Sequence, residues 1–276
     1  MKVSIFFILF LFRCSFIFAQ TYLHGIVVDN EDNKPVPYTT IGLINRARGT
    51  VSNVDGKFSI DLGVKIGDND TLRFSSVGYQ TRDFLVRDLN KSLSTPQLVI
   101  ALKKSITELK PVIVSSTHAH IKILGYETTS KLLGLGFGTN SIGSQGGVRL
   151  QVNHKNTNIE NLSFFIIQNS FESLTFRINI YEMNGGKPGD NILNSNIIVK
   201  ILNKQTGKIT VDLASYKVYV DKDALITLEW IEAKPATIGT LDIAAVLFGS
   251  TYFREASQYV WRKKGTGLGI SVKTNY

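Results

Sequence analysis

Apolar residues recur at every second position through much of this sequence, and this alternation restricts the folds open to it. It is clearest in segments 57–62, 148–152, 176–180, 209–213 and 226–230. A period of two is typical of strands with one face in a core and the other in solvent. Turn signals such as Asp55-Gly56 separate these segments. Short strands with frequent turns predict an all-β chain built of β-sandwiches. The best helical candidate, 243–248, is too short to change that class.

The first twenty residues have the composition of an export signal. Lys2 precedes an apolar run at 3–12, and a small residue, Ala19, precedes Gln20. Arg13 interrupts the run, which is therefore shorter than the roughly 20 residues that span a membrane. We predict a signal peptide at 1–19 and no transmembrane segment after its cleavage. The mature chain is expected outside the cytoplasm.

Cysteine and charge narrow the chemistry of the mature chain. The sole cysteine, Cys14, lies inside the signal, so neither disulfides nor thiolate ligands are expected. Removing Lys2 and Arg13 leaves 29 of the 31 basic residues against 22 acidic ones. These charges are spread along the chain, and the basic run 262–264 is too short for a nucleic-acid footprint. We expect no nucleic-acid partner.

Composition changes near the middle of the chain and indicates two domains. Pro111 interrupts strand pairing, and six glycines follow within 134–147. We place the boundary near Ser115, which gives domains at 20–115 and 116–276. The stretch 121–137 is too apolar for a flexible linker, so we expect it to open the second domain as irregular edge structure.

Four ordered blocks in the first domain resemble a known family. They are HGIVVD at 24–29, KPVPY at 34–38, GTVSNVDGKF at 49–58 and LRFSSVGY at 72–79. Together they resemble the carboxypeptidase regulatory-like domain of Bacteroidetes surface and periplasmic proteins. The resemblance covers about 21–103 and implies a seven-stranded, transthyretin-like or prealbumin-like β-sandwich. The resemblance implies a non-catalytic module of the kind that also extends the N-terminus of TonB-dependent outer-membrane receptors. It further implies that the exported chain lies in the periplasm, at the outer membrane or on the cell surface.

The blocks also have local structural meaning. Asp55-Gly56 predicts a tight hairpin between 49–53 and 57–62, because glycine adopts the positive φ such a turn requires. Gly78 permits a bend that folds Tyr79 back over the sandwich. In the second domain, segments 159–167, 176–182, 186–189, 209–213 and 228–230 resemble jelly-roll modules. Related jelly rolls include carbohydrate-binding and adhesin-like modules.

The residues of a zinc carboxypeptidase are missing from the sequence. No histidine is followed three positions later by Glu or Asp, as its ligand set requires. His118 and His120 supply two ligands at most, which is an incomplete metal site. Neither a nucleophile elbow nor a dinucleotide-binding loop is found. Glu229 and Glu232 are a pair of carboxylates, but the sequence does not set the distance between them that glycoside hydrolysis would require. We expect no catalytic residues, no metal and no cofactor.

Binding is the function that remains. Aromatic residues of the second domain could form a stacking platform for a sugar or peptide. Trp230 is expected in the core, whereas Trp261, with Arg262, Tyr259 and Tyr252, is the candidate ligand-binding group. The leading hypothesis is a non-enzymatic exported cell-envelope protein that acts as an adaptor or ligand-binding module. Its partner would be a glycan or an envelope protein. The alternatives are a carbohydrate-binding or carbohydrate-degrading accessory protein, and a partner of a TonB-dependent receptor system.

Overall fold

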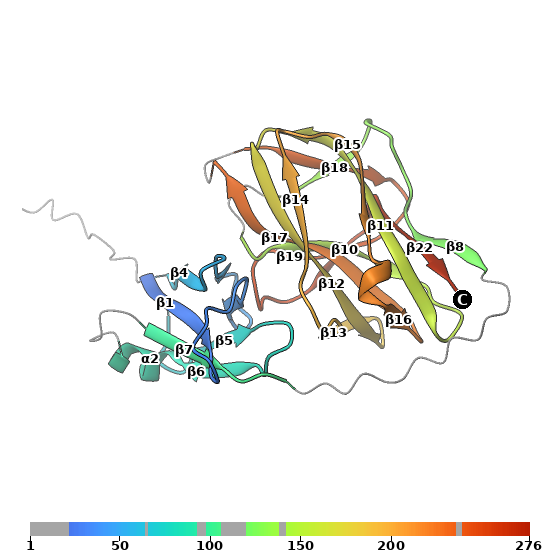
Figure 1. Cartoon of the computed structure of the whole chain (residues 1–276). Coiled ribbons are helices and arrows are strands. Elements are labelled where there is room, and N and C mark those ends of the chain that lie inside the picture. Colours follow the sequence, from blue (N-terminus) through green and yellow to red (C-terminus); the bar gives the residue numbers. More distant parts are fainter. Residues whose placement is uncertain (1–21, 64–65, 93–97, 106–119, 138–141, 236–238) are drawn as a thin grey trace, which may run out of the picture.

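The chain folds into two β-sandwiches that pack against each other (Figure 1). The computed structural model describes residues 22–63, 66–92, 98–105, 120–137, 142–235 and 239–276. In these ranges strands dominate, with one α-helix, α2 (Val86–Ser92), and one 3-10 turn, η1 (Ala214–Tyr216). The predicted all-β class is thus confirmed. The predicted signal at 1–19 and the boundary at Ser115 lie outside the described residues. None of the described helices is long and apolar enough to cross a membrane.

The first sandwich has two sheets around one core. The described strands are β1 (Tyr22–Asp29), β2 (Thr40–Leu43), β3 (Gly49–Val51), β4 (Lys57–Asp61), β5 (Thr71–Ser75), β6 (Arg82–Leu85) and β7 (Leu98–Leu102). One sheet has the order β4-β1-β7 and the other β3-β2-β5-β6. Their alternating apolar residues meet between the sheets, where the rings of Phe58 and Phe74 contact edge to face at 5.5 Å. The sandwich implied by the first-domain resemblance is therefore present.

The turn at Asp55-Gly56 forms, but it does not close a hairpin within one sheet. Gly56 has φ +72°, and its N–H donates to the carbonyl of Asn53 at 3.0 Å, as in a tight turn. The strands on either side pair elsewhere, β3 with β2 and β4 with β1. The predicted hairpin is therefore wrong, because alternation reveals a strand but not the sheet that it joins.

The bend at Gly78 brings its neighbour back over the first sandwich. Gly78 has φ +82°. The ring of Tyr79 packs against the core, and its hydroxyl donates to Asp29 Oδ2 at 3.1 Å. Lys104 lies 3.2 Å from the same carboxylate and ties the end of β7 to β1. These bonds explain why the sequence needs glycine followed by tyrosine here.

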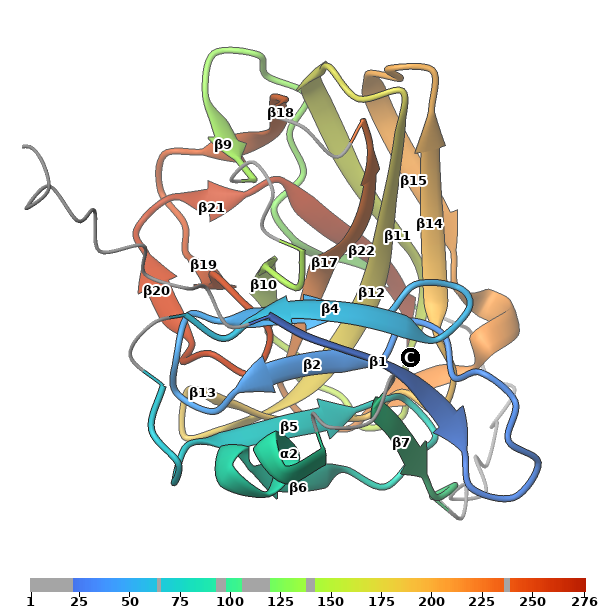
Figure 2. The same cartoon turned by 90° about the vertical axis from the view of Figure 1, so that its left-hand side faces the viewer.

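The second sandwich also consists of two sheets. The sheet nearer the first sandwich, here called the docking sheet, contains β10 (Gln145–Leu150), β12 (Ser173–Asn184), β13 (Lys187–Asn191), β14 (Ile197–Leu202), β17 (Ala224–Lys234), β19 (Thr251–Arg254) and β20 (Arg262–Lys264). The far sheet contains β8 (Ile121–Gly125), β9 (Gly134–Gly136), β11 (Thr157–Asn169), β15 (Gly207–Asp212), β16 (Val218–Val220), β18 (Leu241–Val246), β21 (Gly267–Leu268) and β22 (Ile270–Asn275). Figure 2 shows the first sandwich lying in front of the docking sheet.

One aromatic cluster marks the core between these two sheets. Trp230 is 1% exposed, which confirms that it is a core residue. The rings of Phe171 and Phe176 meet it edge to face, with centroids 5.2 and 5.8 Å away. Edge-to-face pairs at such distances add to the stabilisation from buried area.

The helix expected at 243–248 is wrong. This segment belongs largely to β18, which pairs with β11, β9 and β21. A short apolar run is compatible with a buried strand as well as with a helix, and length alone does not decide between them. Neighbours from three other parts of the chain supply the hydrogen bonds that make it a strand.

Strand β12 departs from simple alternation. Phe176, Ile178 and Ile180 enter the core as expected, but Arg177 and Asn179 on the opposite face are only 2% and 1% exposed. This segment is therefore not the half-solvated strand that its sequence predicts. Its polar face is covered where the two sandwiches meet.

Candidate functional site

Strand register places four polar residues in one row across the docking sheet. Arg177 on β12 pairs with Glu229 on β17, Glu229 with Gln145 on β10, and Gln145 with Arg254 on β19. Cross-strand partners project from the same face of a sheet, so these side chains are neighbours. We call them the polar row. Arg177, Glu229 and Gln145 are at most 2% exposed, and Arg254 is half-buried.

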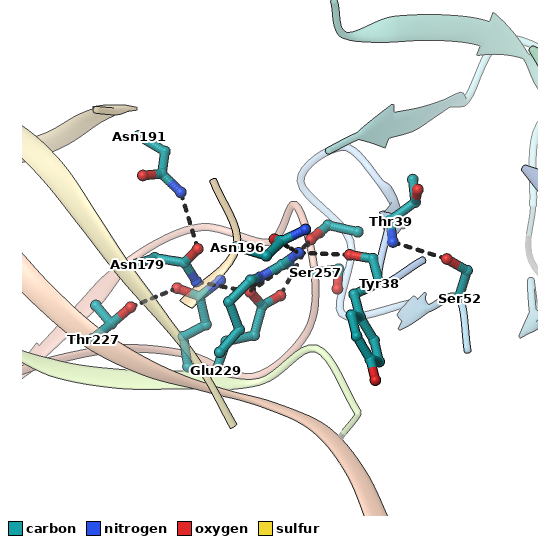
Figure 3. Close-up of polar contacts among 12 residues, drawn as sticks. Tyr38, Thr39, Ser52, Asn179, Asn191, Asn196, Thr227, Glu229 and Ser257 are labelled. Carbon is teal, nitrogen blue, oxygen red and sulfur yellow. Dashed lines mark hydrogen bonds and ion pairs between the residues drawn. The ribbon is translucent and has the colours of Figure 1, made fainter. Parts of the chain in front are cut away.

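An ion pair lies at one end of the polar row. Arg177 donates to Glu229 Oε2 from Nε at 2.9 Å and from Nη2 at 2.6 Å, and Asn179 Nδ2 donates to the same oxygen at 2.8 Å (Figure 3). Burial alone would raise the pKa of Glu229. The charges of Arg177 and Arg254 and the hydrogen bonds from Arg177 and Asn179 outweigh burial and lower that pKa below its usual value. Glu229 is therefore an anion in the folded chain.

The same arginine joins the two sandwiches. Arg177 Nη1 donates to the carbonyl of Tyr38 at 2.5 Å, and Nη2 donates to Thr40 Oγ1. Thr40 in turn donates to Glu229 Oε1 at 3.3 Å. Figure 3 shows the segment that carries Tyr38 facing Glu229. The ion pair of the second sandwich therefore holds the start of β2 in the first.

Glycines allow the backbones to approach at this junction. A Cβ added at Gly42 would lie 2.1 Å from the carbonyl oxygen of Ser257, and one added at Gly49 would lie 2.8 Å from the Ser257 nitrogen. Ser257 is fully buried and donates its hydroxyl to the carbonyl of Thr50 at 3.1 Å. Only residues without a side chain fit β2 and β3 this close to the 257 segment.

A cleft of about 200 Å³ opens beside the ion pair, with walls from both sandwiches. The first sandwich contributes Thr40, Arg73 and neighbouring residues, and the second contributes Arg177, Asn179 and others from β12 and β13. Hydroxyl, amide and charged groups predominate in this lining. The cleft is therefore suited to a polar ligand.

Aromatic rings form one side of the cleft. Trp261 is half-buried and meets Tyr181 edge to face at 5.4 Å. The Arg254 guanidinium lies 4.8 Å from the Trp261 ring centroid and 5.8 Å from that of Tyr181, within the range of cation–π attraction. Its Nη2 donates to the Tyr181 hydroxyl at 3.2 Å, and that hydroxyl donates to Gln145 Oε1 at 3.0 Å. Three aromatic and cationic side chains are thus fixed as a unit.

Of the four residues predicted to bind ligand, one lies in the cleft wall and three lie outside it. Trp261 lines the cleft. Tyr252 is 6% exposed and donates its hydroxyl to the carbonyl of Gly186 at 3.3 Å. Arg262 is exposed and donates to the Tyr259 hydroxyl at 3.1 Å, and neither residue is among the described residues of the cleft wall.

Sequence reasoning missed the polar row. Its only signal is a charged residue between apolar neighbours in two strands, Arg177 in 176–178 and Glu229 in 228–230. Opposite charges in two apolar strands can indicate a buried ion pair as well as two solvated faces. Whether the pair forms depends on the register of the two strands, and whether it is buried depends on the first sandwich covering it.

The histidine motif at 118–120 lies only partly within the described residues. No group of three or more His, Cys, Asp or Glu residues there could hold a metal ion. His118 lies outside the described residues, and the ring of His120 stacks with that of Tyr276 at 5.8 Å.

Comparison with known families identifies the first sandwich. Residues 23–114 match the model of the CarboxypepD_reg-like domain. This confirms the resemblance for the first sandwich, which is one third of the chain. No curated protein matches the sequence.

Solved structures resemble the chain only distantly. The cysteine protease and lectin-like domains of Cwp84, a surface layer associated protein of Clostridium difficile, are 11% identical with a TM-score of 0.40; the match covers 92% of this chain and 57% of that one. The structure of the infectious bursal disease virus Gx strain is 9% identical with a TM-score of 0.28, covering 92% of this chain and 62% of the other. The chain thus spans less than two thirds of either. These scores assign no fold family to the second sandwich, and its jelly-roll class stays a prediction.

Proposed function

We propose that the protein is a non-enzymatic, exported cell-envelope protein that binds a carbohydrate in the cleft between its two sandwiches. The observation that carries this proposal is the position of Trp261 beside hydroxyl, amide and guanidinium groups from both sandwiches. Aromatic rings stack on the apolar faces of sugars, while fixed polar groups bind their hydroxyls. Ligand sites also occur preferentially where domains meet.

The size and stiffness of the cleft agree with this role. Its volume of about 200 Å³ is below the 300–1,000 Å³ typical of pockets that bury a drug-sized ligand. One sugar ring or one chain end is therefore the part that enters. The ion pair between Arg177 and Glu229 fixes both walls before the ligand arrives, which reduces the ordering cost of binding.

The carboxylates at the cleft favour binding over hydrolysis. Asp190 is the only carboxylate among the described residues that line it. Glu229, next to the cleft, is held by Arg177 and Asn179. Glycoside hydrolysis in most families requires two carboxylates placed on opposite sides of the bond. The expected activity is recognition without cleavage.

Trp261→Ala is expected to weaken glycan binding by about tenfold or more, because the variant loses the stacking ring. The measurement is a glycan array and a peptidoglycan pull-down with mature protein, followed by calorimetry on the glycan retained. Tyr216→Ala is the matched control, because Tyr216 is a 40% exposed aromatic on η1 that is not among the residues of the cleft wall.

Equal binding by wild type and Trp261→Ala would place the ligand elsewhere and contradict the proposal. Binding of no glycan by either protein would also overturn it. That result would favour an adaptor for an envelope protein or a partner of a TonB-dependent receptor system. Crosslinking in envelope fractions would then identify the partner.

A further inference from the structure

We infer that the cleft recognises an acidic sugar and that Arg254 binds its carboxylate. This inference rests on the proposed function and adds the chemical class of the ligand. It is drawn from three features of the cleft: its charge balance, an unpartnered hydrogen-bond donor on Arg254 and the orientation of the Arg254 guanidinium.

The charged groups of the cleft leave one arginine without an anion. Arg73 donates to both oxygens of Asp83 at 2.7–2.8 Å, and Arg177 is paired with Glu229. Arg254 makes no ion pair with any described residue, nor does Asp190, whose carboxylate is exposed. The half-buried Arg254 thus has a charge that an incoming anion can neutralise.

Two buried donors next to each other also have no partner. Nε of Arg254 and Nε2 of Gln145 are buried and donate to no described residue. Arg254 lines the cleft, whereas Gln145 is not among the described residues of its wall. The two residues are direct cross-strand neighbours, and Gln145 is 2% exposed. Buried N–H groups are nearly always satisfied by protein, water or ligand. A water or a ligand that accepts a hydrogen bond would satisfy Nε of Arg254.

The guanidinium is held in an orientation that suits a carboxylate. It lies against the rings of Trp261 and Tyr181, and one of its nitrogens is fixed by the Tyr181 hydroxyl. Arginine binds planar carboxylates through two parallel N–H groups, and a guanidinium fixed by stacking loses little freedom on binding. A sugar acid has its carboxylate directly on the ring. The ring can therefore reach Trp261 while the carboxylate reaches Arg254.

The test compares an acidic and a neutral ligand of equal length by calorimetry on the mature protein. The probes are a galacturonic acid trisaccharide and the corresponding galactose trisaccharide. Wild type should bind the acidic one at least about tenfold more tightly, as expected for charge-assisted hydrogen bonds. Arg254→Gln should remove that preference. Asp190→Asn, which removes a negative charge from the cleft, should increase it. Arg262→Gln removes an exposed charge outside the cleft wall and should leave it unchanged.

The outcomes separate this inference from the proposed function. If both trisaccharides bind equally and Arg254→Gln changes neither, the acidic specificity is wrong but sugar binding survives. If neither binds while other glycans do so through Trp261, the inference also fails alone. If inorganic phosphate competes as well as free galacturonate, the site is a general anion site and the assignment is overturned. Because Arg254 also donates a hydrogen bond to Tyr181, the thermal unfolding of each variant is compared with that of wild type. Asp190→Asn tests the charge argument without removing that bond.

Discussion

Glu229→Ala is expected to lower the free energy of unfolding by about 3–5 kcal/mol. The substitution leaves the Arg177 guanidinium buried without its anion. It also removes the acceptor of Asn179 and of Thr40, so the bond from Thr40 that crosses between the sandwiches is lost as well. Urea unfolding of the mature protein measures the change.

Two further variants show that the cause is the broken pair. Glu232→Ala makes the same change on the same strand, where the carboxylate is half-exposed and lies 3.7 Å from Lys234. It should cost less than about 1 kcal/mol. The double variant Arg177→Met with Glu229→Met removes both charges and should recover much of the loss. A loss below about 1 kcal/mol for Glu229→Ala would contradict the buried pair.

The ion pair also predicts how stability depends on pH. The pKa of Glu229 is lower in the folded chain than its ordinary value, so the unfolded chain takes up this proton first as the pH falls. The stabilisation is therefore complete above about pH 4.3 and is lost as the pH falls through the lower folded value. Acid unfolding of Glu229→Ala should lack this contribution.

Gly42→Ala is expected to separate the two sandwiches without disturbing the core of either. The new Cβ would lie 2.1 Å from the carbonyl oxygen of Ser257, so the backbones at the junction must move apart. Overpacking of this kind costs about 1–3 kcal/mol. Calorimetric unfolding should broaden or split into two transitions, and glycan binding in the cleft should weaken.

Gly67→Ala is the matched control for this prediction. It adds the same methyl group to the first sandwich, where the nearest atom would be 3.7 Å away, an ordinary contact. It should therefore unfold and bind like wild type. If Gly42→Ala also behaves like wild type in both measurements, the tight junction between β2 and Ser257 is wrong.

Local pattern was sufficient for most strands and for the first sandwich. Alternation located β4, β12 and β17, and it placed Trp230 in the core. The four sequence blocks indicated the domain that the family model matches at 23–114. These features depend on neighbours in sequence, on turn residues and on the preference of apolar side chains for a core.

Features set by distant parts of the chain could not be predicted in this way. Segment 243–248 is a strand because β9, β11 and β21 flank it. Arg177 is buried because Tyr38 and Thr40, more than 130 positions earlier, cover it. Trp261 was singled out as an aromatic in a basic loop, but its association with Tyr181 and Arg254 depends on the order of strands in the docking sheet.

Tryptophan fluorescence tests the central claim, ligand binding at the cleft, most directly. The chain has two tryptophans; Trp230 is 1% exposed in the core and should give a constant background, whereas Trp261 lines the cleft. Titration with the bound glycan should change the emission saturably, with the same Kd as calorimetry, and Trp261→Phe should remove or strongly reduce the change. Calorimetric binding that leaves the emission of the wild type unchanged would show that the ligand binds away from this cleft.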